Sequence, residues 1–584
     1  MEKNVALAMF LIFAIWMTYI LIFAPKPKPI PLAESGRDTV ETSRAQQRQE
    51  AAPGEPAPAA QAGEEPLVHP DTLDFPVDTV VVSSELYEYS FITRGGILSR
   101  ASLKKFPAFE TGKNRGNRSE GPVQLIPPEG SLFLYSRLYL KSLERPIELG
   151  SRHFETRTTR LNLSKSKPEG SVEFISTLSG GNEIRIVYTF HNDSYLVGAR
   201  LYLPDVLYGS AENTLEVALG PTLVSNEKDP KDDHSDYGVV YYDNGEVVRK
   251  SLKDLGKSDW APSGTQSILW GGLKSKYFLA SFFVPDKPMS AMHGSGNPES
   301  LDLAYRGMFP IPTRPEPIDF SFYLGPQSYE QLTRLNFGLT KLFQYGWAII
   351  QPFCKILLKV LLWMHQWVSN YALILVLFAL LYKVVSWPLT IKSTKSQIKM
   401  QQIQPLMNEL KVKYKDDPKK MQEETLRMYK EYKVNPLGGC LPILVQMPVL
   451  IALFYVFRLT IEFRGAEAFG WIHDLSQPDP YYILPVAMGL TQFVMQKLTP
   501  TPTDPKMVPM LYIMPVFMVF IFLNFSSGLV FYYTFVNIFQ LAQQLYINRR
   551  YHAPALAVAG AGQARIPQAG AAAEAKKTKK GRKK

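Results

Sequence analysis

The chain has 584 residues, a formal net charge of +11 and a mean hydropathy of -0.08. That average combines strongly apolar segments with a large polar middle and a basic tail. It excludes a uniform globule and leaves room for a membrane bundle with at least one soluble domain. The two cysteines of the sequence, Cys354 and Cys440, both lie in apolar segments and exclude a disulfide framework or a zinc site.

Two segments precede the first predicted domain. Residues 1–24 are predicted to be a transmembrane anchor, because the apolar run 5–24 is long enough to cross a bilayer. A cleaved signal peptide is the alternative, but Phe23-Ala24-Pro25 lacks a small-x-small cleavage site. Residues 25–66 are rich in Pro, Ala, Glu and Gln and are predicted to be a disordered linker.

Residues 67–328 are predicted to form an all-β sandwich domain. Short alternating or apolar runs, such as residues 183–188, are bounded there by Gly, Pro and Asn or Asp. Asp243-Asn244-Gly245 predicts a tight hairpin turn. We find no serine nucleophile elbow, zinc-protease motif or phosphate loop, so the domain is predicted to be a binding or scaffolding module.

An acidic cluster lies inside this predicted domain. Asp232, Asp233, His234 and Asp236 are close enough in sequence to be imagined as metal ligands. Carboxylates in a loop are mostly exposed to water, however, and we expect this cluster to be solvated.

Residues 337–368 are predicted to be an amphipathic helix that lies in the membrane interface. Apolar residues recur at helical spacing, with Lys355, Lys359 and His365 between them. A plain buried helix is the alternative interpretation.

Residues 369–548 are predicted to be a transmembrane core of five helices, at 371–391, 438–459, 481–497, 508–525 and 527–546. With the anchor, this predicts a membrane protein with an α-helical bundle of six transmembrane helices and an all-β domain on one side.

The charges of the loops predict the orientation. The stretch 392–433 has eleven Lys or Arg against six Asp or Glu, whereas 461–480 has one Arg against four acids. The positive-inside rule therefore places 392–433, the basic tail 549–584 and the N-terminus in the cytoplasm, and the β domain outside. Lys26 and Lys28 lie just beyond the first span, on the predicted outer side, and contradict this orientation. We keep the orientation because the five later spans agree with it.

Lys383 is the strongest candidate site residue, because it is the one charged residue in the run 371–391. A charge at the bilayer centre costs roughly 2.5 to 3.5 kcal/mol on insertion scales, so such a residue is a functional hypothesis by default. A lysine that snorkels is the alternative, but Lys383 lies about 13 Å from Lys392 along a helix, a long reach for its stem. No acidic residue lies in any of the five spans, so water is its predicted partner.

Several other polar side chains fall within the predicted spans. A polar group in hydrocarbon needs a partner or water, so they are predicted to line an interior cavity. Interhelical hydrogen bonding is the alternative, and for any single glutamine we favour it. They are Gln446, Gln492, Gln496, Asn524, Asn537, Gln540, Gln543 and Gln544.

The cytoplasmic stretch 392–435 is predicted to be a hairpin of two helices. The first runs from Lys392 to about Lys415, and Asp417-Pro418 supplies the N-cap and first-turn proline of the second. Methionines and tyrosines give the hairpin a soft apolar face. Packing of the two helices on each other and binding of a partner are both left open.

Four sequence blocks stand out in residues 337–548: Asn435-Pro-Leu-Gly-Gly-Cys-Leu-Pro-Ile-Leu-Val-Gln-Met-Pro448, Trp471-Ile-His-Asp-Leu475, Asp479-Pro-Tyr-Tyr-Ile-Leu-Pro485 and Ser527-Gly-Leu-Val-Phe-Tyr-Tyr533. In this order they resemble the signature blocks of the YidC membrane protein insertase family, of the Gram-negative type with a large periplasmic domain. The resemblance implies a bacterial inner membrane location and a hydrophilic groove that opens to cytoplasm and lipid and is closed outside. It also implies an outer β-supersandwich, a mobile cytoplasmic hairpin and insertion without nucleotide hydrolysis.

The same resemblance implies roles for single residues. Lys383 matches the groove arginine of the family, and lysine there keeps the charge but loses the bidentate fork. Ala379 stands where a threonine is often seen, so that contact is not carried over. Tyr532 and Tyr533 match tyrosines that face substrate, and Gln446 matches a polar groove residue. Together with Gln492 and Asn537, these residues form the expected substrate groove.

The expected function is a membrane protein insertase and chaperone, not an enzyme, with no cofactor, metal or catalytic residue. Short polar segments of nascent membrane proteins would cross the membrane through the groove, while burial of an apolar span supplies the energy. Expected partners are nascent membrane proteins, the secretory translocon, membrane lipids and, through the basic tail, ribosomes. A solute transporter or channel using the same cavity is the alternative, although we see no inverted repeat. A membrane-anchored enzyme is a third possibility.

Overall fold

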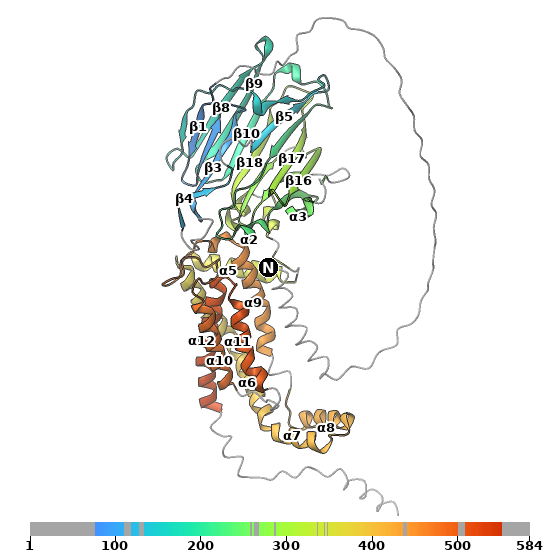
Figure 1. Cartoon of the computed structure of the whole chain (residues 1–584), viewed down its shortest axis with the longest axis vertical. Helices are drawn as coiled ribbons and strands as arrows, with labels where there is room; N and C mark the ends of the chain where they lie inside the picture. Colours follow the sequence, from blue (N-terminus) through green and yellow to red (C-terminus); the bar gives the residue numbers. More distant parts are fainter. Residues whose placement is uncertain are drawn as a thin grey trace, which may run out of the picture. The chain divides into compact units, whose positions relative to one another are not determined.

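The computed structural model describes residues 76–551, apart from 110–117, 128–132, 257–259, 262–267, 285–287, 336, 344, 347–348, 436–440 and 500–507. The predicted anchor 1–24, the predicted linker 25–66 and nearly all of the predicted tail 549–584 lie outside these ranges. Strands occupy the first half of the described chain and helices the second half (Figure 1).

In the described residues eighteen strands form three sheets, and every pairing between these strands is antiparallel except β1 with β7. The first sheet runs β4 (Arg118–Gln124), β3 (Ile97–Phe109), β2 (Tyr87–Ile92), β1 (Thr79–Ser83) and β7 (Arg160–Asn162). The second runs β13 (Glu246–Ser251), β12 (Gly238–Asp243), β14 (Ile268–Lys274), β15 (Phe278–Phe283), β18 (Ile318–Pro326), β10 (Leu196–Tyr202), β9 (Glu183–His191) and β8 (Glu169–Thr177). The third runs β16 (Ala291–Asn297), β17 (Asp302–Pro310), β11 (Thr214–Leu219), β5 (Leu134–Tyr139) and β6 (Ile147–Glu148).

The burial pattern of the strands shows where the core of the β domain lies. In β9 buried and more exposed residues alternate, so one face of this strand packs inward and the other meets water. In β15 every residue is buried, which means that both faces of this central strand are covered. The eight-stranded sheet is therefore one layer of a β-sandwich, as the alternating runs predicted, and its residues Ile186, Tyr188 and Phe320 face the other two sheets from the same side.

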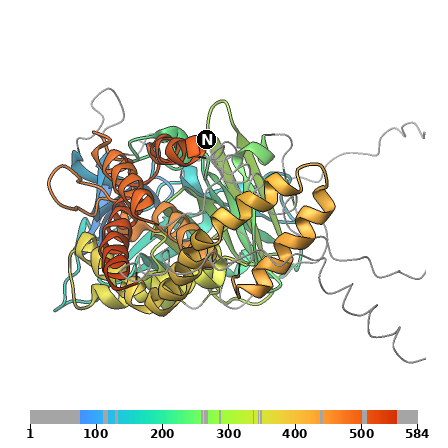
Figure 2. The ribbon, with the colours of Figure 1, turned by 90° about the horizontal axis from the view of Figure 1, so that it is seen from below.

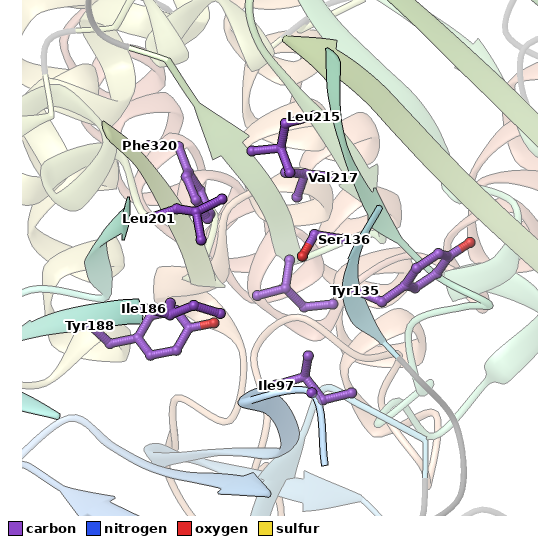
Figure 3. Close-up of a pocket in the computed structure, with 11 residues that line it drawn as sticks. Ile97, Tyr135, Ser136, Ile186, Tyr188, Leu201, Leu215, Val217 and Phe320 are labelled. Carbon is purple, nitrogen blue, oxygen red and sulfur yellow. The ribbon is translucent and has the colours of Figure 1, made fainter. Parts of the chain in front are cut away.

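Side chains of all three sheets meet around one small cavity (Figure 3). Ile97 comes from the first sheet, Tyr188 and Phe320 from the second, and Leu215 and Val217 from the third. The cavity has a volume of about 20 Å³, which is close to the space that one water molecule needs. It marks the junction of the layers and is too small to hold a substrate.

The predicted hairpin turn is confirmed. Asn244 and Gly245 connect β12 to β13, with φ angles of 47° and 87°. Positive φ at both central residues is what a two-residue type I′ turn requires, and Asn followed by Gly tolerates it best. Local sequence chemistry therefore sets the register of this hairpin.

Helices fill the rest of the described chain. Short helices of the β domain are η1 (Leu149–Ser151), η2 (Ser179–Gly181), η3 (Asp205–Leu207), α2 (Pro230–His234) and α3 (Leu252–Leu255). Between β18 and α5 lie α4 (Tyr329–Arg334) and η4 (Leu339–Leu342). The longer ones are α5 (Gln351–His365), α6 (Tyr371–Gln402), α7 (Gln404–Lys413), α8 (Pro418–Glu431), α9 (Leu441–Leu459), α10 (Ile483–Leu498), α11 (Val508–Phe522) and α12 (Ser527–Tyr551), with η6 (Ile461–Phe463) after α9.

A helix occupies each of the five predicted core spans, namely α6, α9, α10, α11 and α12. Among the described residues, α6 alone is long and apolar enough to cross a membrane by itself, and the apolar stretches Val445–Leu459 and Tyr512–Phe522 are shorter. The β-rich domain and the helical region are thus established, whereas the total of six spans stays a prediction.

Helix α5 is apolar on more than one side. Cys354 and Leu358 are fully buried, and the Cys354 thiol lies 3.7 Å from the carbonyl oxygen of Ala452 on α9. Phe353 and Trp363 instead expose about half of their surface. A helix that packs on one side and presents aromatic side chains on the other is compatible with a membrane interface, and the location of this helix stays a prediction.

The hairpin predicted for residues 392–435 differs in one respect from the prediction. Helix α6 continues without interruption to Gln402 instead of a new helix beginning at Lys392, and Pro405 then stands in the first turn of α7. The second helix is as predicted, because Asp417 caps α8 by accepting a hydrogen bond from the Lys420 backbone N–H. Figure 2 shows α7 and α8 from below, and they pack on each other.

We expect Gly271→Ala in β14 to lower the stability of the protein by about 1 to 3 kcal/mol, because overpacking a filled core costs about that much. An added Cβ would lie 2.0 Å from the hydroxyl oxygen of Tyr305, which is fully buried. Thermal unfolding of the purified protein in detergent measures the effect. Gly198→Ala in β10 of the same sheet is the control, since its nearest neighbour would be 3.7 Å away. Equal unfolding temperatures for the two variants would contradict the packing argument.

Candidate functional site

Lys383 lies on α6 and is 4 % exposed. Its ammonium donates a hydrogen bond to the side-chain Oε1 of Gln540 on α12, a helix that packs against both α6 and α10. The sequence predicts water as a partner and does not identify this amide as one. The sequence showed that no acid was available, but it could not show that an amide on the last helix lies at the same depth.

A stripe of small polar residues leads away from Lys383 along α6. Ser386, Thr390, Ser393 and Thr394 follow it at intervals of three or four residues, so they share its face of the helix. The last three are buried. The Thr390 hydroxyl donates to the Ser386 carbonyl at 3.0 Å, and the Thr394 hydroxyl donates to the Thr390 carbonyl at the same distance.

This stripe was missed at the level of sequence, although its signal was present. Hydroxyl residues repeat there with the helical period that starts at Lys383, and a helical projection would have shown them. Because the stripe extends from the buried ammonium toward the basic hairpin, it continues the polar surface along one helix face.

The facing side of α12 carries polar side chains at matching intervals. Tyr532, Gln540 and Gln543 are separated by eight and three residues and share one face. The ring of Tyr532 lies 5.7 Å from that of Phe378 on α6. Its hydroxyl, and both amide atoms of the 2 % exposed Gln543, have no hydrogen-bond partner in the described part of the chain. Buried polar atoms normally have partners, so these atoms mark a place for water or a polar ligand.

We call the two facing stripes the α6–α12 seam. It consists of Lys383, Ser386, Thr390, Ser393 and Thr394 on α6 and of Tyr532, Gln540 and Gln543 on α12. Its only charge is the ammonium of Lys383, which an uncharged amide holds.

The remaining predicted groove residues lie elsewhere in the bundle. The Asn537 amide donates to α10, to the carbonyl oxygen of Met488 at 3.5 Å and to the hydroxyl of Thr491 at 3.4 Å. The ring of Tyr533 stacks on Phe522 of α11, with 5.8 Å between the centroids. Tyr532 and Tyr533 therefore contact different helices, as neighbouring positions on a helix must.

Two further predicted residues, Gln446 and Gln492, are half-buried on α9 and α10. The structure thus brings Lys383 and Tyr532 together in the seam and places Tyr533 and Asn537 against α11 and α10.

A hydrogen-bonded loop covers the ends of α9, α10 and α12 that lie opposite the hairpin. In residues 461–482 the Asp479 carboxylate accepts from the indole N–H of Trp471 at 3.0 Å and from the backbone of Leu484 at 2.7 Å, which caps α10. The backbone N–H of Gly528, at the start of α12, donates to the Leu475 carbonyl at 2.9 Å. Buried carboxylates and carbonyls thus tie this loop to the helices.

The acidic cluster of the β domain is not a solvated loop, so that prediction was wrong. Asp232 accepts from the Lys276 ammonium at 2.8 Å and from the Arg458 guanidinium of α9 at 3.1 Å, while Asp236 lies 3.3 Å from Arg458. Burial opposes ionisation of Asp232, but the two nearby cations outweigh it and lower the pKa of this carboxyl. Among the described residues no group of side chains could hold a metal ion.

A second buried ion pair lies beside this cluster. The guanidinium Nε of Arg464, which follows η6, donates to Glu227 at 2.6 Å, and both side chains are almost fully buried. Burial raises the pKa of Glu227 to about 7, because desolvation outweighs the attraction of Arg464.

Two sequence families match the chain. The family described as "60Kd inner membrane protein" matches residues 363–554, and the one described as "YidC periplasmic domain" matches residues 79–363. A "Membrane protein insertase YidC" of Chlorobaculum tepidum is 33% identical over 582 residues, covering 94% of this chain and 95% of the relative. One of Syntrophus aciditrophicus is 31% identical over 565 residues, covering 94% and 100%.

Among solved structures, the chain is similar to the one titled "Active YidC insertase crystal structure with the first transmembrane domain resolved". The sequence identity is 19%, the TM-score is 0.35, and the match covers 81% of this chain and 94% of the other.

We expect the buried Glu227 carboxyl to make stability depend on pH. Its folded pKa of about 7 lies above the ordinary value near 4.3, so its protonation stabilises the folded state at low pH, and this contribution is lost as the pH rises to about 7. Between about pH 5 and about pH 8 the wild type should lose about 1 to 3 kcal/mol relative to Glu227→Gln. Thermal unfolding of both proteins in detergent across this range measures the difference, and parallel curves would refute the assignment.

Proposed function

Because this chain belongs to the YidC membrane protein insertase family, we propose that it carries polar segments of its substrates into the membrane along the α6–α12 seam. The protein is an inner membrane insertase with a periplasmic domain, its substrates are membrane proteins, and it is not an enzyme. The contacts of Lys383 and its neighbours support a physical account of how the chain performs that task.

The observation that carries the proposal is the pairing of Lys383 with an uncharged amide. Gln540 satisfies one N–H of the ammonium but does not neutralise its positive charge. A carboxylate would add direct attraction between opposite charges to the hydrogen bond, which the neutral amide cannot supply. An acidic residue in a substrate's polar segment would therefore displace the Gln540 amide and be held at the depth of Lys383.

The neighbouring hydroxyls and amides extend this effect along the seam. Moving a charged side chain to the bilayer centre costs about 2.5 to 3.5 kcal/mol on insertion scales. Ser386, Tyr532 and Gln543 offer hydrogen-bonding groups near the path, which lowers that cost by replacing water. No bond is made or broken, so the protein needs no catalytic group.

The energy for insertion comes from the substrate itself. About twenty consecutive apolar residues favour the bilayer over water, and this supplies the driving force for moving a short polar segment with them. The seam only has to hold the polar segment partway while the apolar span leaves toward lipid. Tyr533, Gln446, Gln492 and Asn537 are proposed as further contacts of substrate along the neighbouring helices.

The finer topology and partners are part of the same proposal. We place the N-terminus, the hairpin 392–435 and the tail 549–584 in the cytoplasm and propose six spans, with the domain limits given above. The secretory translocon and membrane lipids are proposed partners of the helices. The basic tail is proposed to bind ribosomes, because clustered lysines and arginines bind the phosphates of nucleic acids. The solute transporter alternative has no support, since the family is one of insertases.

We expect Lys383→Ala to slow insertion of a single-span substrate with an acidic outer tail by about five- to thirtyfold, which corresponds to losing about 1 to 2 kcal/mol of interaction. Lys383→Arg keeps the charge and should retain most of the activity. Protease protection of the tail in proteoliposomes made with each purified protein measures the rates.

Two controls make this result specific. Lys355→Ala removes an exposed lysine from α5 and should leave insertion unchanged. A substrate whose tail has no acidic residue should respond little to Lys383→Ala. Equal rates for the wild type and Lys383→Ala with the acidic substrate would show that the seam charge is not used.

A further inference from the structure

Three charged residues stand close together at the end of α9 and in the segment that comes after it. Arg458 lies in the last turn of α9, Glu462 lies in η6, and Arg464 comes directly after η6. We call 458–464 the latch segment. Each of these side chains bonds to a different part of the chain that precedes α5.

Arg464 is held in a closed site of the β domain. Its Nε donates to Glu227 at 2.6 Å, and its two other nitrogens donate to the carbonyl oxygens of Pro107 at 2.8 Å and Asn226 at 3.0 Å. The rings of Phe109 and Phe278 lie 4.7 Å and 5.6 Å from the guanidinium carbon. All three nitrogens of the planar guanidinium thus donate, each to a different acceptor, and the single nitrogen of a lysine ammonium could not reach all three positions.

Arg458 and Glu462 make two further contacts. Arg458 bridges Asp232 at 3.1 Å and Asp236 at 3.3 Å, and so joins the end of α9 to α2 and the residues after it. The Glu462 carboxylate accepts from the backbone N–H of Tyr329 at 3.2 Å, at the start of α4. Ser328, the N-cap residue there, makes no capping bond with its side chain, so Glu462 satisfies a donor that the helix itself leaves open.

The burial of these charges separates the latch segment from ordinary surface ion pairs. Exposed pairs contribute little because water competes for them. The side chain of Arg464 is 0% exposed and that of Glu227 is 5% exposed, so separating them would leave the guanidinium charge of Arg464 buried without its acidic partner. The contact is consequently specific: it tolerates neither a shifted register nor a partly open interface.

The latch segment is joined to the helices that carry the proposed groove residues. Helix α9 leads directly into it and carries Gln446. The loop after the latch segment bonds to the start of α12, where the Ser527 hydroxyl donates to the Asp474 carbonyl at 2.9 Å and the Ser527 N–H donates to the Gln477 carbonyl. Helix α12 carries Gln540, the partner of Lys383.

We propose that Arg464, with Arg458 and Glu462, is a positioning residue that locks the β domain onto the outer ends of α9 and α12 and so keeps the outer side of the membrane core closed. The β domain then acts as a rigid brace for the loop 461–482. This role concerns the outer ends of the helices and does not depend on how substrate uses Lys383.

Arg464→Glu tests the proposal, because it places a carboxylate against Glu227 in a buried site. Spin labels at Val206→Cys in the β domain and Tyr481→Cys before α10, both exposed positions, report the distance between the two parts in a Cys354→Ala, Cys440→Ala background. The wild type should give one narrow distance peak, and Arg464→Glu should lose it. Proteoliposomes of this variant should leak a small trapped dye that wild-type vesicles retain.

Two matched variants keep the test specific. Arg200→Glu makes the same change of charge in an exposed pair with Asp319, also within the β domain, and should keep both the narrow peak and tight vesicles. The swap of Glu227→Arg with Arg464→Glu restores the attraction and should recover part of the narrow peak, which a general loss of stability would not allow.

The result that overturns the proposal is equally definite. If folded Arg464→Glu keeps the wild-type distance and tight vesicles, the contact does not position the helices. If Arg464→Glu does not fold, Arg458→Glu decides, because this side chain is 15% exposed and faces Asp232 and Asp236. A narrow peak and tight vesicles in Arg458→Glu would reject the proposal, and their loss would support it.

Discussion

A positive charge that is buried between membrane helices has to be hydrogen-bonded, and the arrangement of the helical region satisfies this constraint at Lys383. The amide of Gln540 fills that need without neutralising the charge. A carboxylate in the same place would have formed a closed ion pair and neutralised that charge. Because Gln540 is uncharged, the ammonium of Lys383 is hydrogen-bonded but keeps its full positive charge.

The same requirement explains why the surroundings of Lys383 are polar only on one side. Ser386, Thr390 and Thr394 lie on its own helix face, while α6 presents apolar side chains such as Leu380 and Val384 outward. Burying a hydroxyl in the membrane costs little free energy when the hydroxyl donates to a carbonyl of its own helix. A helix can thus carry a polar stripe inside the bundle and remain apolar where it meets lipid.

Buried charges also occur where α9 and the segment after it contact the β domain, but there they are paired with opposite charges. There each charge meets an opposite one, as with Arg464 and Glu227 or Arg458 and Asp236. A buried ion pair is weak evidence for stability but holds its partners in one arrangement, because any other leaves a charge unpaired. The charge of Lys383 in the helical region thus meets an uncharged amide, whereas the charges next to the β domain meet opposite charges.

What the sequence by itself determined is what local chemistry decides. Asn244-Gly245 set the turn between β12 and β13, Asp417 set the start of α8, and apolar runs placed a helix at each predicted core span. The sequence also identified Lys383, because a single charged residue in the apolar run 371–391 can be recognised without knowing its partner. Only the tertiary structure decided which groups meet. That Gln540 holds Lys383, and that Asp232 binds Arg458 instead of water, depends on contacts across 157 and 226 residues of chain, which no helical or strand period encodes.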